Sequence, residues 1–126
     1  DRVMGMTFSE FGRRIKSNAS TGTDHGAAAP LFVFGSKVNP GISGVNPTIP
    51  ATATTNDNIP MQYDFRSVYA TILNKWLCVD AKDLEQIMLK NFQTLPIINS
   101  LACNKSVNLS GENFITNFGL LHECSI

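Results

Sequence analysis

Residues 3–35, VMGMTFSEFGRRIKSNASTGTDHGAAAPLFVFG, decide how this chain of 126 residues is interpreted. An apolar run at each end flanks a polar connecting segment rich in Gly and Ser. Short apolar runs bounded by turn residues are typical of buried strands, although a buried helix also fits them. The connecting segment carries Glu10, Asp24 and His25. In open α/β sheets ligands gather at loops that leave strand ends, so we expect any site of this chain to lie here.

The composition fits a single domain and excludes two classes of partner. A chain of this size can bury roughly two-thirds of its unfolded surface, which suffices for a core. Ten basic residues balance ten acidic ones, so the formal net charge is zero. Nucleic acids and anionic membranes both favour basic surfaces, and we expect neither as a partner. Nor is any apolar run long enough to span a bilayer, so no membrane span is expected.

The apolar patterning predicts an α/β arrangement. Strands are expected at three short apolar runs: 3–8 as an interior strand, 31–35, and 95–98. Large apolar side chains recur at helical spacing over residues 64–79, where Asp64 can cap the first turn. Because its apolar stripe is continuous, this helix should pack against a sheet face.

A second, shorter helix is expected over residues 82–89. Asp80 serves as its cap, and Leu84, Ile87 and Met88 form its buried side. Residues 38–58 contain many turn residues and predict a long functional or flexible loop.

The three cysteines form an odd set without metal-type spacing. Cys78 lies in the apolar helical pattern and is expected to be a small buried side chain. Cys103 and Cys124 flank a polar tail, and two alternatives stay open for them: a disulfide in an oxidising compartment, or free thiols.

Asp24 and His25, followed by Gly26, form the best candidate metal contact. Carboxylate oxygens and imidazole nitrogens bind divalent ions such as zinc, and a glycine lets the backbone turn tightly beside the ion. Two adjacent residues rarely complete a site, and Glu10 is the only further ligand nearby. The alternative is a loop in which Asp24 accepts backbone hydrogen bonds and His25 bonds a neighbour.

Several segments together resemble the C-terminal part of a bacterial family, domain-of-unknown-function family 1501. They are TFSEFGR at 7–13, GTDHG at 22–26, LFVFG at 31–35, YDFRSVYATIL at 63–73, and Trp76-Leu77. The resemblance covers roughly residues 2–98. Members of that family are mostly exported with twin-arginine leaders, and the family is similar to the alkaline phosphatase and sulfatase superfamily.

That resemblance implies a fold and a division of the chain. Residues 1–98 would be the C-terminal part of a sulfatase-like α/β domain, an alkaline-phosphatase-like sandwich with a central sheet and flanking helices. Residues 99–126 would be an unassigned tail with partial disorder. The catalytic nucleophile would lie upstream, so the catalytic residues are unknown and the chain would require the upstream part of its own protein.

Two alignments to the superfamily's metal site are possible. In one, Asp24-His25 stands for the adjacent Asp-His pair. In the other, which chain order favours, Glu10 takes the carboxylate position and His25 the later histidine. The second alignment puts Phe11 where the superfamily has a metal-binding histidine.

The resemblance therefore implies an exported protein, periplasmic or extracellular, that hydrolyses a phosphate or sulfate ester of a small molecule or glycan. Glu10, Asp24 and His25 would contribute to a site for zinc, calcium or manganese. The competing hypothesis is a non-catalytic, degenerate module that binds a glycan or a partner at the cell surface. Phe11 and the low charge favour this second hypothesis.

Overall fold

Five strands form the main sheet of the computed structural model, which describes residues 3–99 and the strand at 118–125. Along the sheet the order is β1, β4, β7 and β5, and β6 also pairs with β7. β4 pairs antiparallel with β1 and β7, whereas β5 and β6 run parallel to β7. The bounds are β1 (Met4–Met6), β4 (Ala29–Gly35), β5 (Gly41–Ser43), β6 (Tyr63–Asp64) and β7 (Phe118–Ser125).

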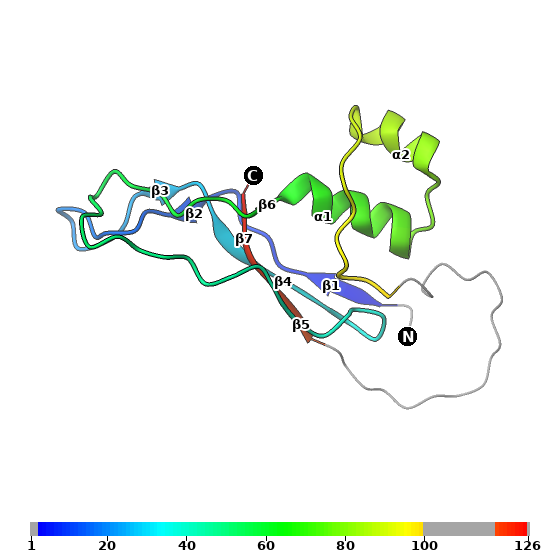
Figure 1. Ribbon diagram of the computed structural model, residues 1–126, viewed down its shortest axis with the longest axis horizontal. Helices are drawn as coiled ribbons and strands as arrows, with labels where there is room; N and C mark the ends of the chain where they lie inside the picture. The colour runs from blue at the N-terminus through cyan, green and yellow to red at the C-terminus, as the bar shows by residue number, and fades with distance from the viewer. Residues whose placement is uncertain (1–2, 100–117, 126) are drawn as a thin grey trace.

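A second, two-stranded sheet consists of β2 (Gly12–Arg13) and β3 (His25–Gly26). It lies in an extended arm at the end of the molecule away from the helices (Figure 1). Strands and helices together give a mixed α/β architecture, as the patterning predicts.

β7 is the element that the sequence analysis missed, since it lies in the tail left unassigned. It occupies the middle of the main sheet, between β4 and β5. Strands made by long-range pairing need no strong local pattern, because their hydrogen-bond partners come from distant segments. The rest of that tail, residues 100–117, lies outside the described residues, as does the side chain of Cys124 and all of Cys103.

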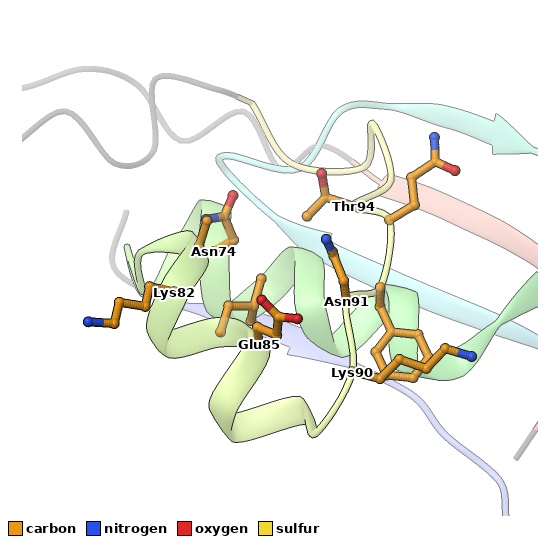
Figure 2. Close-up of a pocket in the computed structure, with 10 residues that line it drawn as sticks. Asn74, Lys82, Glu85, Lys90, Asn91 and Thr94 are labelled. Atoms are coloured by element: carbon orange, nitrogen blue, oxygen red, sulfur yellow. The ribbon is translucent and has the colours of Figure 1, made fainter.

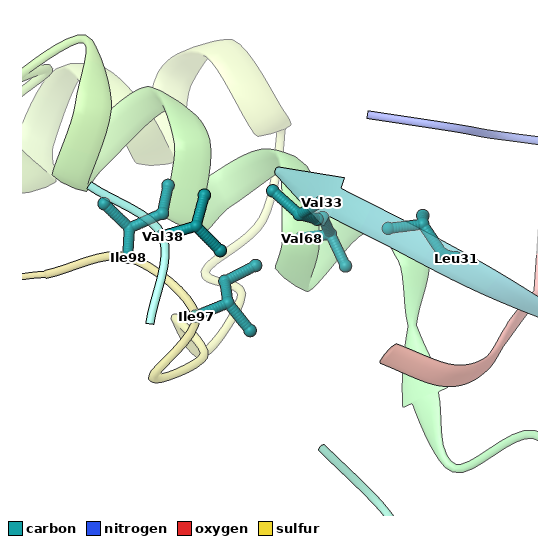
Figure 3. Close-up of a cluster of buried hydrophobic side chains, with 6 residues drawn as sticks. All are labelled: Leu31, Val33, Val38, Val68, Ile97 and Ile98. Atoms are coloured by element: carbon teal, nitrogen blue, oxygen red, sulfur yellow. The ribbon is translucent and has the colours of Figure 1, made fainter. Parts of the chain in front are cut away.

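The core lies between one face of β4 and helix α1 (Phe65–Thr71). Leu31 and Val33 alternate along β4 and are both buried, as the period of two in a strand requires. Val68 of α1 is fully buried among them (Figure 3). Val38, Ile97 and Ile98 complete the buried cluster. On the other face of the strand, Phe34 remains 45% exposed.

The two predicted N-terminal strands are found, with different roles. β1 is shorter than the predicted run and lies at the edge of the sheet, not in its interior. β4 begins two residues earlier than predicted and includes Pro30. The register of β4 against β7 shifts between Ala29 and Leu31. Proline cannot donate to a strand ladder, and this irregularity is a position where it is tolerated.

The strong helical pattern gives α1 followed by a π-helical turn, η1 (Ile72–Trp76). Asp64 caps α1 as predicted, because its carboxylate accepts from the backbone N–H of Arg66 at 2.9 Å. The predicted apolar stripe extends too far, because Leu77, which it includes, is 59% exposed. None of the helices in the described residues is long and apolar enough to cross a membrane.

The second helix, α2 (Ala81–Met88), is confirmed with its predicted cap. The backbone N–H of Asp83 donates to the carboxylate of Asp80 at 2.9 Å. Leu84 is buried as expected, but Ile87 is 56% exposed because no described element covers that part of the helix. An apolar spacing identifies a face of a helix without showing how much of that face is covered.

Three further expectations are corrected. Residues 95–98 do not form a strand but contribute a single bridge, between Ile98 and Val38. The predicted loop at 38–58 contains β5. Cys78 is exposed and disulfide-bonded, not a small buried side chain. Its φ of 57° ends the helix in a left-handed conformation, which the helical pattern does not indicate.

Replacing Asp64 with alanine should lower the free energy of unfolding by about 1 kcal/mol at neutral pH, since the cap is lost. The Arg66 side chain donates to Asp64 and holds the pKa of this carboxyl below its ordinary value of 3.8. The stabilisation is therefore complete above the unfolded pKa and is lost as the pH falls through the folded pKa. Chemical unfolding at neutral pH and at about pH 2.5 measures both effects.

Asp64→Asn is the matched control, because asparagine keeps a capping oxygen and removes the charge. It should lose less stability than the alanine variant at neutral pH. A wild-type advantage over Asp64→Ala that is the same at both pH values would contradict the assignment.

Candidate functional site

His25 is held at the start of β3 by the short hairpin sheet of the arm. Its register partner is Arg13, and Gly26 pairs with Gly12. β1 and β4 are antiparallel neighbours, so the C-terminal end of β1 and the N-terminal end of β4 lie at the same end of the main sheet. Glu10 follows β1 and His25 precedes β4, so both residues lie beyond this end of the sheet.

Phe11 stacks directly on the ring of His25. The two ring centroids are 3.5 Å apart and the planes are inclined by 16°. The guanidinium of Arg13 lies 5.6 Å from the Phe11 centroid, within the range of a cation–π contact. His25 remains exposed, and within the described part of the chain its ring nitrogens have no hydrogen-bond partner. The stack thus fixes the imidazole plane while the ring edge stays available to a ligand.

Asp24 is oriented by the turn that closes the arm. The Asn18 amide donates to one carboxylate oxygen of Asp24 at 2.8 Å. The side-chain oxygen of Asn18 accepts from the backbone N–H groups of Ser20 and Gly22. One oxygen of the carboxylate therefore belongs to the turn, through a side-chain donor and not the backbone donors of the structural alternative, and the other is not used in this network.

Glu10 is exposed in the loop before β2. The neighbouring Ser9 hydroxyl donates to the Phe11 carbonyl at 2.7 Å, which shapes the backbone around Glu10. The Glu10 side chain itself has no hydrogen bond or ion pair to the described residues. Its position is set by the backbone alone.

Residues 54–58 are distant from the arm in the sequence but support it in the structure, and the sequence analysis did not identify this role. Arg14 donates to the backbone carbonyl of His25 at 3.3 Å and to the side chain of Asn56 at 2.8 Å. The side chain of Asn58 accepts from the backbone N–H of Ala27 at 3.0 Å. The Asp57 carboxylate accepts hydrogen bonds from the backbone N–H and the hydroxyl of Thr54. These bonds lower the pKa of the Asp57 carboxyl and hold the turn in this segment. The asparagine-rich composition of the segment is its only signal in the sequence.

The donor atoms do not make a metal site by themselves. Among residues 3–99, no group of three or more His, Cys, Asp or Glu side chains is placed to hold a metal ion. The structure keeps Asp24 next to His25 and brings Phe11 onto His25, but it does not gather Glu10, Asp24 and His25 into one coordination sphere. A divalent ion would need ligands from outside these residues, so no catalytic step follows from the described side chains.

Comparison with known proteins places the chain in a family. The chain matches the family described as "Protein of unknown function (DUF1501)" over residues 1–88. No curated protein and no solved structure matches it. Because the family match spans well over half of the 126 residues, the chain belongs to the DUF1501 family.

Proposed function

We propose that this chain supplies part of the divalent-metal site of an exported, sulfatase-like hydrolase built on an alkaline-phosphatase-like sandwich. The observation that carries the proposal is the Phe11–His25 stack, which presents an exposed imidazole edge beside the strand ends. It supports the alignment in which positions 10, 11 and 25 belong to one site. A bound zinc, calcium or manganese ion would polarise the ester oxygen and stabilise charge that develops there.

The roles of the residues follow from their surroundings. His25 is the principal ligand, because its plane is fixed and its nitrogens face no described partner. Asp24 offers its second carboxylate oxygen, while the first stays bonded to Asn18. Glu10 offers an unrestrained carboxylate. The remaining ligands and the nucleophile would come from residues outside this chain, and the substrate would be a phosphate or sulfate ester.

The disulfide at Cys78 supports the proposal of export. Disulfides persist in the periplasm and outside the cell and are rare where thiols are kept reduced. Thiol labelling of the protein, recovered from its native compartment under non-reducing conditions, would leave Cys78 unmodified.

Titration calorimetry of the full-length protein with zinc, calcium and manganese tests the site. His25→Ala should weaken binding of the preferred ion by at least about tenfold, since a ligand is removed. Phe11→His should strengthen it, because it places an imidazole where the superfamily resembled by this family has a metal-binding histidine. Lys16→Ala, an exposed position in the same arm, is the control and should bind like the wild type. Absence of any heat, or identical heats for His25→Ala and the wild type, would sink the proposal.

A non-catalytic module is the second candidate, and Phe11 is the observation that favours it. The phenyl ring covers one face of His25, and the described carboxylates do not converge on it. A module of this kind predicts that neither the wild type nor Phe11→His binds divalent ions. It also predicts no hydrolysis of p-nitrophenyl phosphate or sulfate by the full-length protein.

A further inference from the structure

A pocket of about 470 Å³ opens between α2 and residues 90–94, far from the arm. Asn74 of η1 also lines it. Figure 2 shows polar side chains from both segments turned toward the same space. The metal-site proposal does not use this pocket.

Three polar side chains of the pocket form no hydrogen bonds with the described part of the chain. Glu85, Asn91 and Gln93 are all exposed, and no hydrogen bond links their side chains to the described residues. In the view of Figure 2, Glu85 lies between Lys82 and Lys90, and the Lys90 ammonium is 5.9 Å from the centroid of the Phe92 ring. The middle of the pocket therefore offers a carboxylate acceptor beside amide donors and acceptors.

The apolar side of the pocket is fixed. Leu84 is only 8% exposed and anchors α2. The Phe92 ring is held by Arg66, whose guanidinium carbon lies 4.8 Å from the ring centroid. Arg66 is in turn bound to Asp64 at 2.6 Å. Well-formed sites combine such an apolar wall with a few polar groups that orient the ligand.

We propose that this pocket binds an uncharged saccharide unit. Sugar hydroxyls both donate and accept, and they match the carboxylate of Glu85 and the amides of Asn91 and Gln93. The C–H face of the sugar ring would lie against Leu84 and Phe92. A sulfated sugar is the competing ligand, because Lys82 and Lys90 also line the pocket beside the one carboxylate, Glu85.

The test uses the full-length protein and three neutral disaccharides: maltose, cellobiose and diacetylchitobiose. Saturation-transfer NMR should detect at least one of them. The double variant Glu85→Ala/Asn91→Ala should weaken its binding at least tenfold. Gln86→Ala, on the same helix but outside the pocket, is the control and should leave binding unchanged. Circular dichroism of the double variant checks that α2 stays folded.

Three outcomes would overturn the proposal: none of the three disaccharides binds, binding survives the double variant, or only a sulfated disaccharide binds and Lys82→Ala/Lys90→Ala removes that binding. The metal titration is independent of these outcomes. The double variant should bind divalent ions as the wild type does, so failure of one proposal is distinguishable from failure of the other.

Discussion

Alanine in place of Gly12 is expected to lower the free energy of unfolding by about 3 kcal/mol, at the upper end of overpacking effects. A Cβ at this position would lie 1.6 Å from the carbonyl oxygen of Ala28, which is backbone and cannot rotate away. The strand pair β2–β3 would have to separate from the start of β4. Urea unfolding followed by circular dichroism measures the loss.

Gly22→Ala is the matched control for this prediction. Gly22 lies in the same arm, but a Cβ there would meet only the Asn18 side-chain oxygen, at an ordinary 3.9 Å. Its cost should stay within about 0.5 kcal/mol, as for most surface substitutions. Gly26→Ala should resemble Gly12→Ala, because its Cβ would lie 2.4 Å from the backbone of Arg13. Equal stability of the Gly12 and Gly22 variants would contradict the close packing of the arm.

The same variant links the fold to the proposed site. Gly12 pairs with Gly26, and this pairing sets the position of His25 against Phe11. If the pairing separates, the stack is lost together with the fixed imidazole plane. Gly12→Ala should therefore weaken any metal binding that depends on His25, whereas Gly22→Ala should not.

Local features of the sequence predicted local features of the fold. Asp64 and Asp80 were identified as helix caps because a cap acts within three residues of itself. β7 was not predicted, because its existence depends on pairing with β4, which lies more than eighty residues away in the chain. Ile87 was misassigned for a related reason, since burial depends on which elements arrive from elsewhere.

In the candidate site, too, local features could be predicted from the sequence and long-range contacts could not. Asp24 and His25 stand out in the sequence as adjacent residues of ligand type. Their surroundings do not, because Phe11 reaches His25 only through the register of β2 and β3. The support from Asn56 crosses an even longer separation. A residue type in a loop can therefore suggest chemistry, but the contacts that favour or oppose that chemistry depend on pairing across the chain.

Thr71→Val should cost up to about 3 kcal/mol, because it leaves a backbone donor without a partner. Thr71 is fully buried at the end of α1. Its hydroxyl donates to the Ser67 carbonyl at 2.6 Å and accepts from the backbone N–H of Leu95 at 2.7 Å. Valine has nearly the same shape, so the cavity term is small and the lost hydrogen bonds dominate. Hydrogen exchange at Leu95 should show this amide losing its protection.

Thr71→Ser separates the two contributions of this side chain. Serine keeps the hydroxyl and removes one methyl group, so the cost should be about 1 kcal/mol and the Leu95 amide should stay protected. Ile97 and Ile98 follow Leu95 after a single proline and lie in the core, so the hydroxyl of Thr71 fixes the segment that closes the core beneath α1. If valine proved as stable as threonine, that segment would be held by apolar packing alone.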